Sequence, residues 1–158
     1  MSVPFASNVT ASRSASRATY GEHIGVADRY FTADEANQLL AQVRPLVEQM
    51  VAHRRSLALA TVRHARIAAT IATNGGGVRP HEVDRLQATI DAEAAEVVRC
   101  VEALQGLGVL VKDLDEGLVD FPARRGDEEV LLCWRLGEAE VAFWHFVDEG
   151  FAGRKPLP

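Results

Sequence analysis

The sequence has 158 residues, 47% of them hydrophobic and 25% charged, which suits one folded domain and is too short for a second sizeable core. A net charge of −5 argues against broad binding to nucleic acid or anionic lipid, because both require a basic surface. No apolar run reaches the roughly 18 residues of a membrane span. The two cysteines, Cys100 and Cys133, show no CxxC spacing. We therefore expect a cytoplasmic protein with reduced thiols that contacts neither membrane nor nucleic acid.

The beginning of the chain predicts a tail followed by a helix. Residues 1–28 are rich in Ser, Ala, Thr and Arg without a sustained period, so we expect a disordered tail there and a single domain at 29–158. Thr32 and Glu35 have the spacing of a capping box, which predicts a helix start. Pro45 either kinks this helix or opens a second one, so a short N-terminal helix is expected ahead of the longer ones.

The middle of the chain predicts a long antiparallel helical hairpin. Apolar residues recur at steps of three and four in residues 46–71 and again in 83–104. Three glycines at 75–77 suit a chain reversal, and Pro80 suits the first turn of a helix. We expect the helical part to occupy 29–107. Two helices leave a broad face uncovered, so we also expect a homo-oligomer formed through them.

The last third predicts a small antiparallel β meander and a C-terminal segment at 108–158, which makes the fold class α+β. After Gly108 the hydrophobic period changes from 3.6 to 2, and turn residues separate the apolar runs. The expected strands are 109–113, 118–121, 130–136 and 141–146. If the last turn pairs Leu136 with Val141, Leu132 meets His145 on one face and Cys133 meets Trp144 on the other.

Four strings carry a family resemblance. They are RYFTADEANQLL at 29–40, VKDLDEGLVDFP from Val111, LLCWRLGE, and FWHFVDEGFAGRKPL at the C-terminus. Together they resemble the bacterial family of unknown function numbered 2203, from Arg29 to Leu157. The resemblance implies a cytoplasmic bacterial protein with a helical hairpin followed by a small β region. It implies no activity.

The densest group of chemically capable side chains, His145, Asp148, Glu149 and Arg154, begins in the last predicted strand and continues beyond its end. An imidazole and two carboxylates within five positions can converge where the chain turns. They would suit a divalent metal bound by His145, Asp148 and Glu149, or acid–base catalysis by His145 and Glu149 on a small molecule held by Arg154. The alternative is a core histidine beside a solvated turn.

Two further ligand-binding candidates lie upstream. Asp113 completes the same site if the meander folds back onto it, or else accepts hydrogen bonds within its own turn. Arg135 lies in an otherwise apolar strand, where a charge needs a partner. It either pairs with Glu116 or forms an anion site with Arg154, because a guanidinium group matches carboxylate and phosphate.

Two classes of function remain open on the sequence. The first is a small metal- or ligand-binding domain, catalytic or not, with a divalent metal as its cofactor and its site at the C-terminal His/Asp/Glu/Arg cluster. The second is a non-catalytic interaction or structural protein that associates through the helical hairpin. The chain has no HExxH, GK[ST], GxSxG or GxGxxG motif, which removes several familiar chemistries. Whether the protein is an enzyme stays open.

Overall fold

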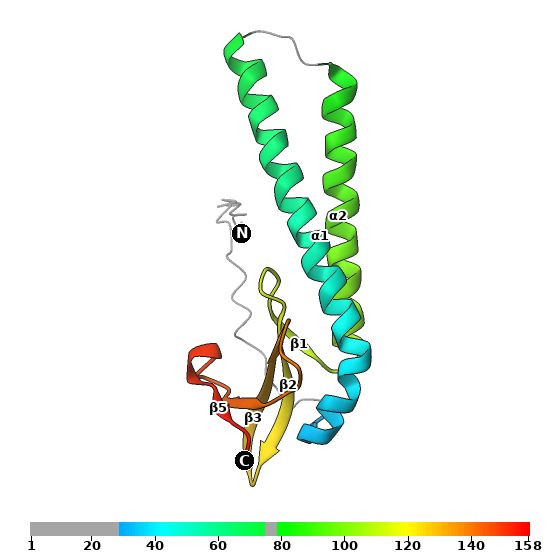
Figure 1. The fold of residues 1–158 in the computed structure, drawn as a ribbon. Helices are drawn as coiled ribbons and strands as arrows, with labels where there is room; N and C mark the ends of the chain where they lie inside the picture. The colour runs from blue at the N-terminus through cyan, green and yellow to red at the C-terminus, as the bar shows by residue number, and fades with distance from the viewer. Residues whose placement is uncertain (1–28, 75–78) are drawn as a thin grey trace, which may run out of the picture.

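A computed structural model describes residues 29–74 and 79–158. Two helices come first, and five strands with a short 3-10 turn follow. In chain order these are α1 (Ala33–Asn74), α2 (Pro80–Gly106), β1 (Leu110–Asp113), β2 (Leu118–Arg125), β3 (Glu128–Arg135), β4 (Phe143–Phe146), η1 (Phe151–Gly153) and β5 (Lys155–Pro156). The predicted α+β fold, a helical hairpin followed by an antiparallel meander, is confirmed (Figure 1). The expected disordered tail lies outside the described residues.

Helix α1 begins at the predicted capping box and continues further than expected. The Thr32 hydroxyl accepts a hydrogen bond from the Glu35 amide at 3.2 Å, and the Glu35 carboxylate accepts one from the Thr32 amide at 2.8 Å. The helix then runs through Pro45 without a break. The separate short helix expected at its start is therefore the first part of α1. Ala41 and Pro45 are both exposed, so water can bond the carbonyl that the proline nitrogen leaves free.

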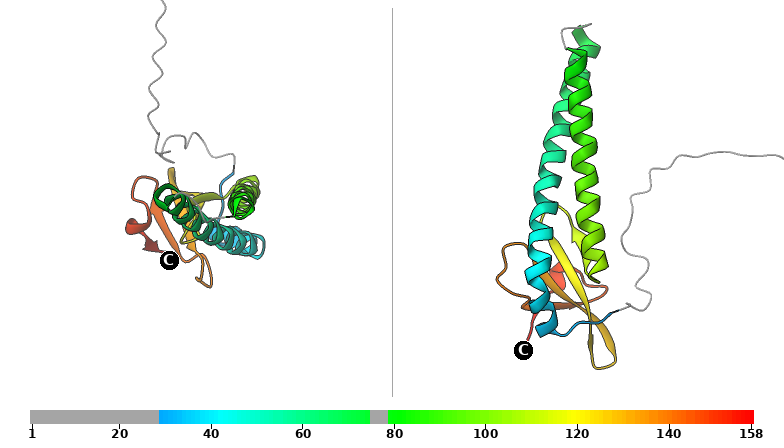
Figure 2. Two further views of the ribbon diagram at one scale, coloured as in Figure 1. Left: turned by 90° about the horizontal axis from the view of Figure 1, so that it is seen from above. Right: turned by 90° about the vertical axis from the view of Figure 1, so that its right-hand side faces the viewer.

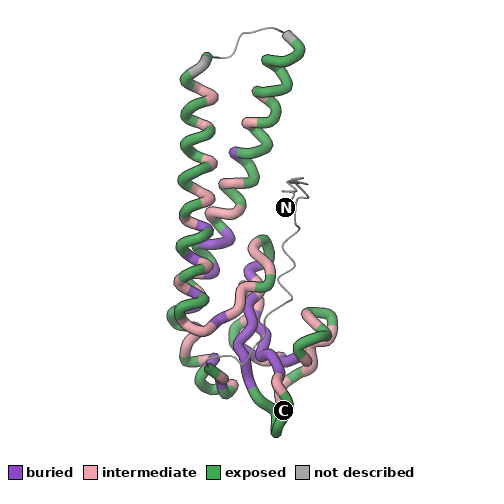
Figure 3. The backbone as a smooth tube through the Cα atoms, turned by 180° about the vertical axis from the view of Figure 1, so that it is seen from behind, coloured by how far each residue is buried: buried purple, intermediate pink, exposed green. Residues whose placement is uncertain are grey.

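The distal part of the hairpin projects beyond the sheet (Figure 1, Figure 2). We call residues 54–74 and 79–90 the arm. Burial falls along the hairpin: Met50 and Cys100 are fully buried near the sheet, whereas Leu59 and Val62 on the arm are 73% and 56% exposed (Figure 3). None of the helices among the described residues is both long and apolar enough to cross a membrane.

The five strands form one sheet in the order β1-β2-β3-β4-β5, each antiparallel to its neighbour. One face belongs to the hydrophobic core that the sheet shares with α1 and α2. It contributes Val119, Phe121, Leu132, Trp134 and Trp144. Side chains alternate between the faces of a strand, so the opposite face carries Asp120, Cys133 and His145.

The pairing of β3 with β4 differs from the expected one by a single residue. Cys133 pairs with Phe143, and Leu132 pairs with Trp144. The prediction that Leu132 would meet His145 is therefore wrong. A one-residue shift exchanges the two faces of a strand. As a result, Cys133 and His145, which the prediction separated, share one face of the sheet.

The physical reason for this shift lies in the connection before β4. The N–H of Val141 donates to Asn37 Oδ1 at 2.8 Å, and its carbonyl accepts from Asn37 Nδ2 at 3.4 Å. The side chain of Asn37, on α1, therefore occupies both backbone groups of Val141. Because those groups are unavailable to β3, Val141 cannot pair with Leu136, and β4 begins two residues later, at Phe143.

Candidate metal centre

Three side chains with metal-binding atoms converge on the face of the sheet opposite the helices. They are Asp120 on β2, Cys133 on β3 and His145 on β4. One ligand atom from each lies within 4.8 Å of the other two. All three residues are at most 2% exposed. Among residues 29–74 and 79–158, this is the one group of three or more His, Cys, Asp or Glu side chains close enough to share an ion.

Local turn geometry brings the first two of these residues together. β2 and β3 are joined by the two-residue turn Gly126-Asp127, and Gly126 has a φ of 64°, a value that favours glycine. This tight turn places Asp120 directly opposite Cys133. His145 lies opposite Leu131, two positions from Cys133 on the same face, and so stands diagonal to the thiol.

The hydrogen bonding of His145 assigns a role to each of its ring nitrogens. Nδ1 lies 2.7 Å from the carbonyl oxygen of Phe146, which can only accept, so Nδ1 carries a proton and donates it. Nε2 lies 3.3 Å from Oδ2 of Asp120. In the neutral ring, Nε2 then carries no proton, and its lone pair faces the carboxylate of Asp120. Either a second proton or a cation must separate these two acceptors, and a backbone partner on the far nitrogen is typical of metal-bound histidines.

Asp120 is incompletely satisfied. Its Oδ1 atom is buried and has no hydrogen-bond partner, while Oδ2 has the ammonium group of Lys112 at 3.7 Å in addition to His145. A buried carboxylate oxygen without a partner is unfavourable, because its hydration is lost and nothing replaces it. The carboxylate therefore retains capacity to bind a cation.

The Cys133 thiol is protonated in the metal-free protein. Its pKa is raised well above the ordinary value, first by burial and then by the negative charge of Asp120. Only the thiolate is a strong metal ligand, so an ion that binds here must displace the thiol proton. Binding of an ion here would therefore release a proton.

The pKa of His145 is also raised. The Asp120 carboxylate is the main cause, and the Phe146 carbonyl adds to it, while burial acts in the opposite direction. The imidazolium form, which donates from both nitrogens, satisfies these two acceptors when no ion is bound.

This raised pKa predicts that the metal-free protein loses stability with rising pH. The contribution of His145 is complete below the pKa of an unfolded histidine, about 6.5, and is lost as the pH rises through the higher value in the folded protein. The expected slope is at most about 1.4 kcal/mol per pH unit. Urea unfolding with a chelator, compared between the parent and His145→Gln, isolates this contribution. A parent-minus-variant difference that grows with pH would contradict the assignment.

The other predicted metal ligands lie outside this group. Asp148 is exposed in the turn after β4. The Glu149 carboxylate pairs with the Lys155 ammonium and accepts from the Phe146 amide at 3.2 Å. These contacts, the lysine first, lower the pKa of Glu149. Of the predicted set, the structure thus places His145 in the three-residue group, and Asp148 and Glu149 in the exposed turn.

The predicted ligand-binding residues are engaged in contacts of their own. Asp113 Oδ1 accepts from the amides of Asp115 and Glu116 at 2.8 and 2.7 Å, as a turn aspartate does. Arg135 lies 3.9 Å from Glu116, the partner considered for it. The guanidinium of Arg154 pairs with Glu138 at 2.7 Å, and both arginines lie over the ring of Phe151.

Sequence reasoning missed Asp120 and Cys133 as site residues, although two signals were available. Asp120 stands between Val119 and Phe121 in an apolar run, where a charge needs a partner. A two-residue turn at Gly126-Asp127 fixes the pairing of the strands on either side and aligns Asp120 with Cys133. The connection to β4 carries no comparable signal, because a helix sets its register.

Comparison with known proteins gives a family. The family described as an uncharacterized conserved protein (DUF2203) matches residues 29–157. This range begins at the first described residue and includes the hairpin, the sheet and all three members of the candidate metal centre. No curated protein and no solved structure gave a match. The chain therefore belongs to the DUF2203 family of uncharacterized conserved proteins.

Proposed function

We propose that this protein binds one divalent transition-metal ion, with Zn²⁺ as the first candidate, through Asp120, Cys133 and His145. The observation that carries the proposal is the buried, incompletely paired carboxylate of Asp120 at the centre. Asp120 Oδ1 has no hydrogen-bond partner, and Oδ2 lies 3.3 Å from a histidine nitrogen whose neutral form is also an acceptor. A cation between them would satisfy both.

The distances and the donor atoms support this class of ion. Two nitrogen or oxygen ligands of a tetrahedral zinc ion lie about 3.4 Å apart, given metal–ligand bonds of about 2.1 Å. The separation of His145 Nε2 from Asp120 Oδ2, 3.3 Å, is close to this value. A thiolate and an imidazole favour zinc and other borderline metals over Mg²⁺ and Ca²⁺, which prefer oxygen ligands.

The enclosure of the site supports a structural or regulatory ion. All three candidate ligands are at most 2% exposed, so a substrate has no direct access to the bound ion. Catalytic zinc sites keep an open position for water or substrate, whereas structural sites are closed. An ion here would link β2, β3 and β4 across one face of the sheet.

Metal content measured on three forms of the protein tests the proposal. After loading with Zn²⁺ and dialysis, we expect the parent to retain one ion per chain by elemental analysis. Asp120→Asn should bind at least about tenfold more weakly, because a second-shell change alone has effects of that size. The double variant Asp148→Asn/Glu149→Gln should retain the ion, since these carboxylates are exposed.

The reverse pattern would overturn the proposal. Retention by Asp120→Asn together with loss in the Asp148/Glu149 double variant would place the ion at the C-terminal cluster. Absence of zinc from the loaded parent would leave the imidazolium–carboxylate pair as the whole role of these residues.

Exposed apolar side chains on the arm favour a second candidate role, association through the helices. Leu59 and Val62 are 73% and 56% exposed and lie three positions apart, on one side of α1. We expect the parent to form a dimer or larger species in light scattering, and Leu59→Ser/Val62→Ser to shift it toward the monomer. A monomeric parent at high concentration would contradict this role.

A further inference from the structure

The charge of the protein is unevenly distributed. Between residues 54 and 90 the chain carries six arginines and only two carboxylates, Glu82 and Asp84, although its net charge is −5. The arginines are Arg54, Arg55, Arg63, Arg66, Arg79 and Arg85. The arm is thus basic while the remainder of the chain is acidic. The whole-chain charge, which argued against a polyanionic partner, conceals this local excess.

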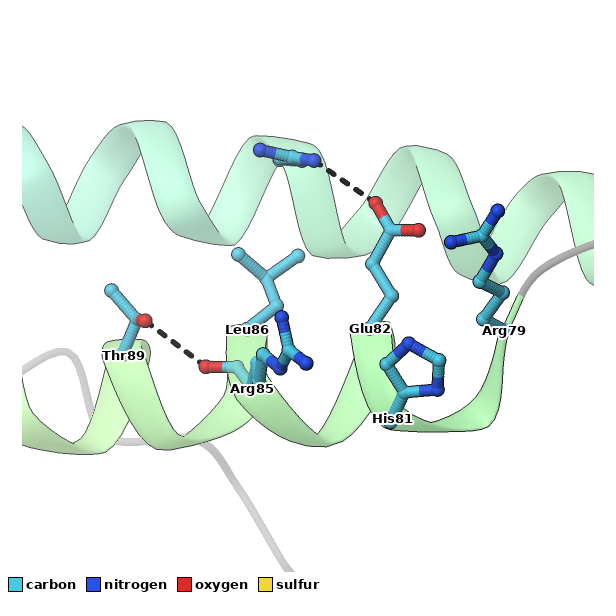
Figure 4. Close-up of a pocket in the computed structure, with 7 residues that line it drawn as sticks. Arg79, His81, Glu82, Arg85, Leu86 and Thr89 are labelled. Atoms are coloured by element: carbon cyan, nitrogen blue, oxygen red, sulfur yellow. Dashed lines mark hydrogen bonds and ion pairs between the residues drawn. The ribbon is translucent and has the colours of Figure 1, made fainter.

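Several of these cationic side chains meet in a hollow of about 360 Å³ between the two helices of the arm. Arg63 approaches it from α1, and Arg79 from the N-cap of α2. The remaining polar side chains of the lining that have a charge or an imidazole come from the first two turns of α2: His81, Glu82 and Arg85. Figure 4 shows the α2 side chains gathered along the helix, with Glu82 extended toward α1. The hollow lies near the distal end of the arm, away from the sheet (Figure 1).

The positive charge in this hollow is only partly neutralised. Arg63 pairs with Glu82 at 3.0 Å, whereas Arg79 and Arg85 form no ion pair with any described residue. The start of α2 adds to the positive potential, because Arg79, at its N-cap, makes no side-chain cap bond and the helix dipole is positive there. Two guanidinium groups are therefore available to an anion.

The residue types define the chemistry of the ligand. Guanidinium groups match the oxygen atoms of phosphate groups, and arginines spaced along a surface can contact successive phosphates of a chain. Residues 32–120 contain no Phe, Tyr or Trp, so the imidazole of His81 is the one aromatic ring in the lining of the hollow. With three arginines against a single ring, recognition here would depend mainly on charge.

We propose that the distal arm binds a chain of phosphate groups through Arg63, Arg79 and Arg85, as presented by a nucleic-acid backbone or by inorganic polyphosphate. The site is separate from the candidate metal centre, and neither proposal depends on the other. Its position on a projecting arm leaves it accessible, while the sheet lies away from the bound polyanion (Figure 1).

Binding of a fluorescein-labelled oligouridylate, followed by anisotropy at low salt, tests the site. For the parent we expect a dissociation constant that weakens with salt. Arg79→Gln/Arg85→Gln should bind at least about tenfold more weakly and reduce the salt slope by roughly 0.7 for each phosphate that the protein no longer neutralises. The matched control is Arg124→Gln/Arg125→Gln, which removes the same charge from the exposed end of β2. This control should bind as the parent does.

For a second variant we expect the affinity for the oligonucleotide to change in the opposite direction. Glu82→Gln removes the carboxylate from the centre of the hollow and releases Arg63, so it should tighten binding several-fold. This gain cannot arise from a loss of folded protein. Far-UV circular dichroism confirms that each variant keeps its helices.

Competition distinguishes the sources of phosphate. Displacement of the labelled oligonucleotide by unlabelled RNA but not by polyphosphate would identify a nucleic-acid backbone, and the reverse would identify polyphosphate. Stronger competition by polyglutamate than by either would overturn the proposal, because the site would then bind carboxylates. Equal loss of binding in the arm variant and the sheet variant would also overturn it, since only overall charge would matter.

Discussion

Saturation with Zn²⁺ is expected to raise the free energy of unfolding by about 4 kcal/mol when the free ion is 1,000-fold above its dissociation constant. The unfolded chain cannot hold Asp120, Cys133 and His145 together, so the free energy of binding becomes free energy of folding. Cys133→Ser should remove most of this increment, because serine does not supply the thiolate. Urea unfolding with and without zinc measures the difference.

Cys100→Ser is the matched control for this experiment. Cys100 is also a fully buried cysteine, but it lies on α2 in the core that the helices share with the sheet. The substitution should lower the stability of the metal-free protein and leave the zinc increment unchanged. An increment of equal size with Mg²⁺, or one that survives Cys133→Ser, would contradict a thiolate-bound ion.

The metal-free protein is expected to lose about 3–5 kcal/mol of stability in His145→Leu, because this substitution leaves the buried Asp120 charge without its main partner. The ammonium of Lys112, at 3.7 Å, is then the remaining cation close to that carboxylate among the described residues. In Asp120→Leu/His145→Leu both charges are gone. The double variant should therefore be more stable than the sum of the single losses implies, by about 0.5–3 kcal/mol.

Urea unfolding of the four proteins in this cycle, at about pH 6 where the unperturbed histidine is largely protonated, gives the coupling energy. Leu131→Ala is a useful comparison, since Leu131 is buried and its neighbour across the strands is His145. It opens a cavity without removing a charge. Strict additivity of the Asp120 and His145 substitutions would show that the two side chains do not interact.

The helical part of this fold was predictable because its signals are local. A capping box marks the start of α1, and Pro80 opens α2 as expected. The missing break at Pro45 has a physical explanation as well. Proline removes one hydrogen bond, but α1 is held by the apolar contacts of Val43 and Val47 on either side, which the sequence pattern alone does not weigh.

The sheet was predictable in kind but not in register. β2 and β3 are longer than the expected strands, since the pairs Ala123–Val130 to Arg125–Glu128 extend the ladder up to the turn. The position of β4 depends on a bond from Val141 to Asn37, a contact between residues remote in sequence. No local pattern reports such a contact. His145 was therefore recognised as chemically capable while its partners, Asp120 and Cys133, were not.

The two hydrogen bonds between the Asn37 side chain and the Val141 backbone also bear on the order of folding. The two residues are separated by 104 positions, so almost the whole described chain must exist before this contact can form. Asp120 and Cys133 meet across a local hairpin, which closes on a microsecond scale, whereas contacts of high sequence separation form late. We therefore expect Asp120 and Cys133 to pair before the register of β4, and with it the position of His145, is fixed.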